Sequence, residues 1–350
     1  MCSMHSPRKR KVQECILNPK RAKEVSALDQ EESMRDITVF LEGSHPYGLK
    51  PWGNFYQDES HTSIRDSSLG RFGVLKDENI LGILEMCCPY SLIRLTACSK
   101  VLYIFSHHED LWRAMTLKEM NGNFDFTNSW KETYCRHKAG RSYVTHRPIK
   151  ISGFYSDLLY QPFLCATLGF DPSWLSVDNV DRRSNLSRQE FIEQYERRNR
   201  PVVITDVVTG WPAFRKWTRE HLLAAAGDAE FVAGGVQITL PRFFRYCDGC
   251  REERPLYLFD KRFLEKCGRE ALAGDFEVPE YFRDDLFALL GDARPDHRWV
   301  IIGPAGSGSS FHVDPNRRGP ARHGAARRRT EGAECGTDRG VAGNRIIFWR

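Results

Sequence analysis

The sequence predicts an α+β chain in which a helical part precedes a part that contains strands. Between residues 71 and 137, apolar residues recur at the spacing of helices that bury one face. From residue 174 onward, short β-branched runs bounded by Gly and Pro indicate strands between short helices. After residue 316 the apolar residues almost disappear, so we expect the folded part to end there.

The composition is that of a globular chain whose positive charge lies at its two ends. The 350 residues suggest about two domains, and 41% of them are hydrophobic. The net charge is +5, but residues 1–25 and 317–350 both carry an excess of Lys and Arg, so residues 26–316 are acidic. Direct nucleic-acid binding is therefore expected only through the basic termini. Eleven scattered cysteines indicate free thiols, and no apolar run predicts a membrane span.

The N-terminal residues 1–43 are polar and charged, and we expect them to be disordered. Two basic clusters, at residues 7–11 and 20–23, resemble a bipartite nuclear-localisation signal. This predicts a nuclear protein, with the cytoplasm as a further location. A solvated basic tail without a targeting role is the alternative.

The helical part follows a segment, residues 44–70, that is rich in Gly, Pro, Ser and His and indicates a linker. We expect Asp77 to cap a first helix, Pro89 to end it, and Ser91 to begin a second one. Residues 138–173 are then a connector to the next domain.

The helical part, residues 71–137, resembles an F-box. The resemblance rests on an opening Leu75-x-Asp77-Glu78, an Ile-Leu helix, and the later segments 92–100 and Leu111-Trp112-Arg113. It implies a three-helix module that docks on the adaptor subunit of an SCF ubiquitin ligase. The alternative is a helical subdomain that only packs on the rest of the chain.

The second domain, residues 174–316, opens with two helix-start signals. Ser187 and Glu190 form a capping-box pattern, and Leu186 and Phe191 have hydrophobic-staple spacing. Gly291 is predicted to stop a later helix. We expect helices over residues 188–198, 217–226 and 284–290, and strands over 200–205, 236–240, 256–259 and 299–302.

The last of these strands leads into a Gly/Ser/Pro loop, residues 303–310, and then into Phe311-His312-Val313-Asp314. On a strand, residues two apart share a face, so His312 and Asp314 would project together. An imidazole and a carboxylate supply two ligands of the 2-His-1-carboxylate triad that holds non-haem Fe(II). The third ligand must come from elsewhere.

The second domain contains, in this order, the segments Arg200-Pro-Val-Val-Ile, Trp211-Pro212, Trp217, 255–260, 278–285, Arg298-Trp299, 303–308 and His312-x-Asp314. Together these segments resemble the JmjC family of 2-oxoglutarate/Fe(II) oxygenases, particularly its arginine demethylases and lysyl hydroxylases with an F-box.

This resemblance implies a double-stranded β-helix (jelly-roll, cupin-like) domain that binds Fe(II) and 2-oxoglutarate. His312 and Asp314 match the first two metal ligands, and Ser309 falls where the subfamily has a hydroxyl residue near the cosubstrate. The implied reaction is hydroxylation or demethylation of Arg or Lys side chains in a histone or another nuclear protein.

The family pattern stops after Asn316. No lysine follows Asp314, and His323 is the one later histidine, in a segment made mostly of Arg, Gly and Ala. We therefore expect a truncated oxygenase domain without turnover, and a disordered tail over residues 317–350. A shift of reading frame explains such a tail, and resequencing would test that explanation. An Arg-rich tail that binds anionic partners is the alternative.

Three further groups of residues have types that can bind metals or act as catalysts. Cys247 and Cys250 have metal-ligand spacing with Cys267 beyond them, but a second pair is missing, which favours a turn with free thiols. The pair Asp284-Asp285 is explained by helix capping. The pair His107-His108 is expected at the surface.

The alternative to an enzyme is a non-catalytic F-box substrate adaptor of an SCF ubiquitin ligase.

Overall fold

A computed structural model describes most of the chain. It divides the chain into two compact units, one of residues 1–45 and 167–177, and one of residues 46–166 and 178–350. The account below concerns the second unit. The described residues are 44–58, 61–140, 144–169, 173, 176, 178–268, 272–296, 298–310 and, for the backbone alone, 345–349.

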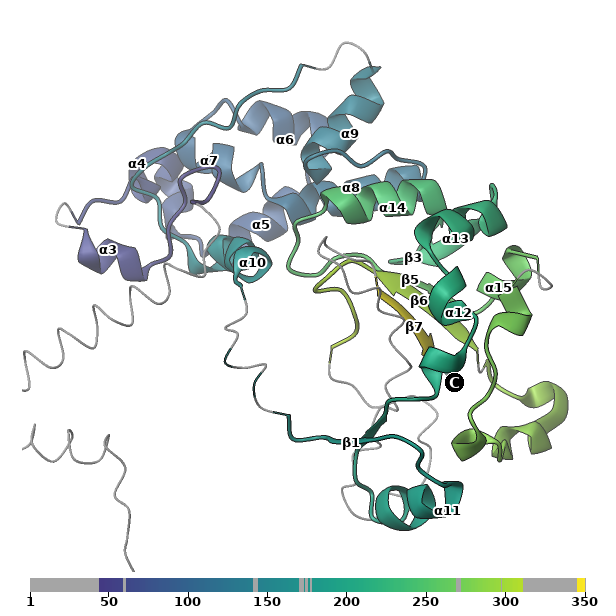
Figure 1. Ribbon diagram of the computed structural model, residues 1–350. Helices are drawn as coiled ribbons and strands as arrows, with labels where there is room; N and C mark the ends of the chain where they lie inside the picture. The colour runs from purple at the N-terminus through teal and green to yellow at the C-terminus, as the bar shows by residue number, and fades with distance from the viewer. Residues whose placement is uncertain are drawn as a thin grey trace, which may run out of the picture. The chain divides into compact units, whose positions relative to one another are not determined.

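The first half of this unit is helical (Figure 1). Its elements are α3 (Gly53–Gln57), α4 (Arg65–Leu69), η1 (Gly70–Val74), α5 (Asp77–Glu85), α6 (Pro89–Leu95), α7 (Lys100–Phe105), α8 (Glu109–Met120), α9 (Trp130–Ala139) and α10 (Asp157–Thr167).

The segment expected to be a linker, residues 44–70, instead belongs to the fold. It contains α3 and α4, and its Leu49 and Leu69 are buried in the main core. The sequence did not predict this, because the segment is mostly Gly, Pro and polar residues and two isolated leucines do not form a helical period.

The starts of α5 and α6 also differ from the prediction. Lys76 occupies the N-cap position of α5, and the Asp77 carboxylate instead accepts hydrogen bonds from Arg65 Nη1 at 2.5 Å and from the Ser156 hydroxyl. Pro89 is the first residue of α6, so Ser91 lies inside the helix. Proline is tolerated at this position because the first helical N–H groups have no intrahelical partner.

The second half of the unit combines short helices with strands. Its elements are β1 (Asp181–Arg183), α11 (Arg188–Phe191), η4 (Ile192–Glu196), β2 (Val202–Ile204), η5 (Val208–Gly210), α12 (Ala213–Lys216), α13 (Arg219–Ala226), β3 (Glu230–Ala233), β4 (Val236–Thr239), α14 (Leu240–Gly249), β5 (Leu258–Asp260), α15 (Phe263–Lys266), η6 (Ala273–Asp275), η7 (Glu280–Phe282), η8 (Leu286–Ala293), β6 (Trp299–Gly303) and β7 (Arg345–Trp349).

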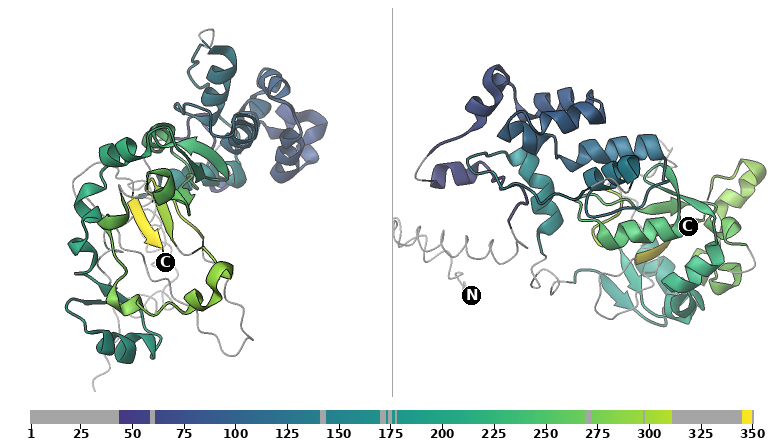
Figure 2. Two further views of the ribbon diagram at one scale, coloured as in Figure 1. Left: turned by 90° about the vertical axis from the view of Figure 1, so that its right-hand side faces the viewer. Right: turned by 90° about the horizontal axis from the view of Figure 1, so that it is seen from above.

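Five of these strands form one antiparallel sheet in the order β4-β3-β5-β6-β7, and α14 packs against β3 and β4 (Figure 1). A separate parallel pair joins β1 to β2. Figure 2 shows β7 in yellow at the end of the large sheet. The chain therefore has the predicted α+β class.

Strand β7 differs from the expected disordered tail. The backbone of residues 345–349 pairs with β6, with Ile346 opposite Ile302 and Trp349 opposite Trp299. The sequence places this apolar run more than 30 residues after the strand it joins, so no local signal predicts the pairing.

Local signals in the second half are otherwise mostly confirmed. Ser187 and Glu190 form the predicted capping box. The helix predicted over residues 188–198 is α11 followed by a π-helix, η4. Gly291 has φ 52°, as a helix stop requires, but the surrounding η8 is a 3-10 helix rather than an α-helix.

The two halves share one hydrophobic core, and Trp130 is at the junction. Its backbone N–H donates to Glu109 Oε2 at 2.6 Å, and its buried ring Nε1–H donates to Glu252 Oε1 at 2.9 Å. The Tyr246 hydroxyl donates to the same Glu252 oxygen at 2.9 Å. Gly122 touches the β4 backbone so closely that a Cβ would lie 1.8 Å from the Gln237 carbonyl oxygen.

Among the helices in the described ranges, none has the length and apolar character needed to cross a membrane.

Glu109 should make stability depend on pH. Burial raises the pKa of Glu109 from an ordinary 4.5 to about 7, the Trp130 N–H opposes the rise, and Glu252 adds to it. Between these values the folded state holds a proton that the unfolded state has released, so Glu109 favours folding increasingly as the pH falls from 7 toward 4.5. We expect Glu109→Gln to remove about 3 kcal/mol of this pH dependence.

Urea unfolding on either side of this pH range measures the effect, with the exposed Glu230→Gln as the control. Equal pH dependence in the wild type and in Glu109→Gln would contradict it.

Candidate functional site

Strand β6 leads the chain to the predicted metal-binding stretch. Val300 and Ile302 are buried on one face of the strand, and backbone pairing with β5 and β7 holds it on both edges. On the other face, the Trp299 ring stacks on Phe259 at a centroid distance of 4.3 Å and an interplanar angle of 10°. The strand is therefore a fixed support for the loop that follows it.

The loop begins with a tight turn. Ser307 donates to the Pro304 carbonyl oxygen twice, from its backbone N–H at 3.1 Å and from its hydroxyl at 2.7 Å. Gly303 lies so close beneath this turn that an added Cβ would lie 2.1 Å from Ser307 Oγ and 2.9 Å from Tyr257 Cβ. Glycine is thus required here by space rather than by backbone conformation.

The predicted site residues are only partly covered by the structure. Ser309 is exposed in the loop after the turn. His312 and Asp314 lie outside the described residues, as does His323. Within the described ranges, no group of three or more His, Cys, Asp or Glu residues could hold a metal ion.

The cysteines near the end of α14 are free thiols. Burial raises the pKa of Cys247 far above its ordinary value, and it raises the pKa of Cys250 to about 11 and that of Cys267 to about 12. Because the thiolate is the form that binds metals and attacks electrophiles, these protonated side chains favour packing over chemistry.

The acidic pair Asp284-Asp285 forms ion pairs, which corrects the capping interpretation. Asp284 binds Arg188, and Asp285 binds Arg294. No capping hydrogen bond comes from the Asp285 side chain at the start of η8.

His107 was expected at the surface, but it is half-buried. Its Nδ1–H donates to the Tyr103 carbonyl oxygen at 2.6 Å, and its Nε2 accepts from Lys131 Nζ at 2.5 Å. Burial, with the Lys131 charge as a second cause, lowers the pKa of His107 to about 4. The neutral ring therefore serves the packing of α7 against α9.

Two buried carboxylates were assigned no role from the sequence. Asp260 accepts from the backbone N–H groups of Val232 and Arg262 and from Lys266 Nζ, at 2.7–3.0 Å. This joins β3, β5 and α15. All of its partners are hydrogen-bond donors of the fold, so its role is structural.

Asp275 accepts from Lys216 Nζ at 2.7 Å and from Trp217 Nε1 at 3.0 Å. Burial raises the pKa of Asp275, but these hydrogen bonds outweigh burial and lower the pKa overall. Trp217 and Asp275 are 58 residues apart, and no sequence signal predicts this contact.

No family model matches the chain. Similar proteins nevertheless define a class, that of JmjC-type demethylases and hydroxylases. "Arginine-specific demethylase JMJ22" of Arabidopsis thaliana is 45% identical over 276 residues, which are 78% of this chain and 55% of that protein. "Lysine-specific demethylase JMJ21" of the same plant is 33% identical over 72% of this chain and 27% of that protein.

A third relative is "Bifunctional arginine demethylase and lysyl-hydroxylase psr-1" of Caenorhabditis elegans, 36% identical over 43% of this chain and 40% of its own length. The chain thus spans about half of the length of JMJ22 and less of the other two. These relatives support placing the chain in the JmjC family and imply a cupin-like fold, with which the mixed helices and sheet are consistent.

Gly303→Ala should destabilise the turn after β6. The new methyl group has no room between Ser307 and Tyr257, and overpacking of this kind costs about 1–3 kcal/mol. Thermal unfolding measures the loss, and Gly274→Ala, where a Cβ meets nothing within 4 Å, is the control. Adding Ser307→Gly should restore part of the stability. A neutral Gly303→Ala variant would contradict this account of the turn.

Proposed function

We propose that the chain carries the core of a JmjC-type, 2-oxoglutarate- and Fe(II)-dependent hydroxylase or demethylase that acts on Arg or Lys side chains of a protein. The observation that carries the proposal is the 45% identity to an arginine-specific demethylase across 78% of the chain. The relatives' names include both demethylation and hydroxylation, and both Arg and Lys. The substrate protein is proposed to be nuclear, a histone or another protein.

His312 and Asp314 are the proposed Fe(II) ligands. An imidazole and a carboxylate are the donor types of the facial triad, so the donor set fits this metal. Bound Fe(II) would supply hydroxylation of a C–H bond by O2, with 2-oxoglutarate oxidised to succinate and CO2, and on a methylated nitrogen the hydroxylated carbon would leave as formaldehyde. The chain's own part is to hold this stretch. Strand β6 and the Gly303–Ser307 turn directly precede it in the chain, and Ser309 is proposed to lie near the cosubstrate.

We further propose that the 350-residue chain does not turn over by itself. Its sequence after Asp314 contains one histidine, His323, and no lysine for the cosubstrate carboxylate. Metal ligands are normally held by surrounding hydrogen bonds, and the Arg/Gly/Ala composition around His323 offers few groups for this. Arg322 and Arg327 are the nearest cations that could replace the lysine.

Fe(II) should bind weakly to the full chain, and His312→Ala and Asp314→Ala should each abolish the binding, because two ligands alone hold it. Anaerobic titration calorimetry with Fe(II) measures this. The exposed Asp296→Asn is the control for loss of an unrelated carboxylate.

The wild-type chain should release no more succinate from 2-oxoglutarate than the His312→Ala variant does. Turnover that His312→Ala abolishes would overturn the proposed inactivity and support the enzyme. Absence of Fe(II) binding at any concentration would overturn the metal site itself.

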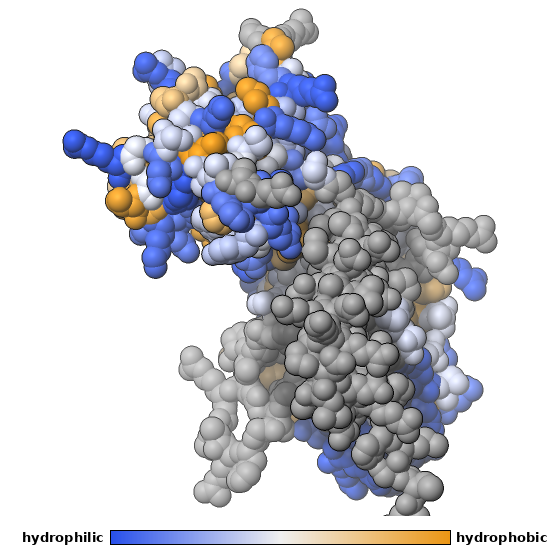
Figure 3. All heavy atoms as spheres, turned by 90° about the vertical axis from the view of Figure 1, so that its left-hand side faces the viewer, coloured by the Kyte–Doolittle hydropathy of each residue, from blue (hydrophilic) through white to orange (hydrophobic). Residues whose placement is uncertain are grey.

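A second candidate function is that of an F-box adaptor in an SCF ubiquitin ligase. The observation that favours it is a set of large apolar side chains exposed on η1, on α5 and the residue that follows it, and on α6. They are Phe72, Val74, Ile83, Met86, Tyr90 and Ile93, at 44–88% exposure. Figure 3 views one face of the chain, and hydrophobic residues in orange are exposed there among hydrophilic ones. If these side chains adjoin one another, they would form the kind of apolar surface that binds a protein partner.

Met86→Glu should prevent co-purification of the chain with the SCF adaptor subunit, because a charge placed in an apolar interface loses its hydration. Met86 is 87% exposed, so the fold should tolerate the change. Leu289→Glu is a matched control, since Leu289 is equally exposed on η8, at 87%. If the wild type folds but does not co-purify with the adaptor, the helices serve only for packing.

Nuclear import through the basic clusters 7–11 and 20–23 remains part of the proposal, and both clusters precede the first described residue. A fluorescent fusion that stays nuclear after deletion of residues 1–25 would refute it.

A further inference from the structure

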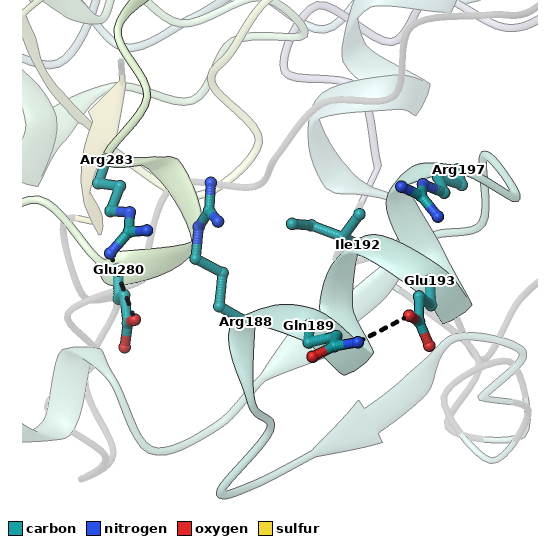
Figure 4. A pocket seen from close by; sticks show the side chains of 7 residues that line it. All are labelled: Arg188, Gln189, Ile192, Glu193, Arg197, Glu280 and Arg283. Carbon is teal, nitrogen blue, oxygen red and sulfur yellow. Dashed lines mark hydrogen bonds and ion pairs between the residues drawn. The ribbon is translucent and has the colours of Figure 1, made fainter.

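A charged pocket is formed by residues outside the predicted metal-binding stretch. It has a volume of about 420 Å³ and is lined by α11, η4 with the residue after it, and η7 together with Arg283 (Figure 4). This volume is within the range of ligand-binding pockets in proteins. None of these residues was proposed above to bind Fe(II) or 2-oxoglutarate.

The walls of the pocket are held by a small core of their own. Leu186, Phe191 and Tyr195 are its buried members. The Phe191 ring contacts Tyr281 at 5.2 Å and Phe282 at 5.7 Å between centroids. The Tyr281 hydroxyl donates to the Leu186 carbonyl oxygen, which ties η7 to the start of α11. The pocket is therefore preformed, which lowers the entropic cost of binding.

The π-helix shapes one wall. The Arg197 N–H donates to the Ile192 carbonyl oxygen at 2.9 Å, five residues back, so this turn is wider than that of an α-helix. Ile192 provides an aliphatic surface between the charged side chains (Figure 4). Single π-helical turns are frequent at functional sites.

Opposite charges lie on opposite sides of the pocket. Figure 4 shows the guanidinium groups of Arg188 and Arg197 on one side and the carboxylates of Glu193 and Glu280 on the other, with Arg283 beside Glu280. Glu280 is 3.9 Å from Arg283, and Glu193 accepts from the Gln189 amide at 3.0 Å. A ligand with a single charge sign would therefore meet repulsion from one side.

Two arginines retain donors for a ligand. Arg188 binds Asp284 through Nη2, but its Nε is buried and has no hydrogen-bond partner in the described part of the chain. A buried donor without a partner costs free energy, which a ligand oxygen would recover. The Arg197 guanidinium also lines the pocket, and it forms no ion pair or side-chain hydrogen bond with the described residues.

We propose that this pocket binds an extended peptide segment of a protein partner in which acidic and basic residues alternate. In an extended peptide, successive side chains point to opposite sides. Alternation therefore places all carboxylates on one side, toward Arg188 and Arg197, and all cations on the other, toward Glu193 and Glu280. The binding goes beyond the proposed oxygenase function and does not need Fe(II), because none of its residues belongs to the metal-binding stretch.

Binding of two fluorescent peptides to the full chain tests the proposal. Each peptide has about six residues and is roughly 20 Å long when extended. One alternates Glu and Lys, and the other has the same composition in two blocks. Their net charges are equal, so non-specific attraction is the same for both. Fluorescence polarisation should show tighter binding of the alternating peptide.

Arg197→Gln should weaken binding of the alternating peptide about tenfold, the value of one lost charge-assisted hydrogen bond. Glu193→Gln tests the opposite side and can still bond to Gln189. Arg254→Gln is the control, because Arg254 is a surface arginine with 86% side-chain exposure outside the pocket. Equal affinity for the two peptides, no binding, or equal effects of Arg197→Gln and Arg254→Gln would overturn the proposal. Loss of Fe(II) binding in His312→Ala leaves this result unchanged, so the two proposals fail separately.

Discussion

The structure depends on the burial of Trp130 with both of its N–H groups satisfied. The backbone N–H uses Glu109 of α8, and the ring N–H uses Glu252, which follows α14. A buried indole is a large apolar contribution only if its N–H is bonded, so the two acidic residues are a condition of the packing. Their cost is carboxylate burial, which raises the pKa of both Glu109 and Glu252.

This junction makes the helical half and the sheet half parts of one core. Phe126 packs edge-on against Tyr246 and Trp130 at 5.1 Å, and Gly249 leaves room for the Phe126 ring. The F-box-like helices are therefore not a module on a flexible tether. Their buried side chains belong to the same hydrophobic cluster as those of β3, β5 and β6.

The parts that could be predicted are those with local causes. The capping box at Ser187 and Glu190, the stop at Gly291 and the strand at Trp299–Gly303 each follow from a few adjacent residues. Expectations that depend on distant partners were less secure. Asp77 was expected to cap a helix, and Arg65 and Ser156 bind it instead. The half of the metal site that the sequence predicts, His312 and Asp314, lies beyond the described residues, so it stays a prediction.

The sequence by itself determined the α+β class, the order of most elements and the similarity to JmjC oxygenases, because these are encoded in periodicity, turn residues and short motifs. Tertiary structure alone decided which distant groups meet. It placed β7 beside β6, Glu252 against Trp130, and η7 against α11 to form the charged pocket. Such contacts join residues dozens of positions apart. No local sequence pattern predicts them, because they form only when the core packs.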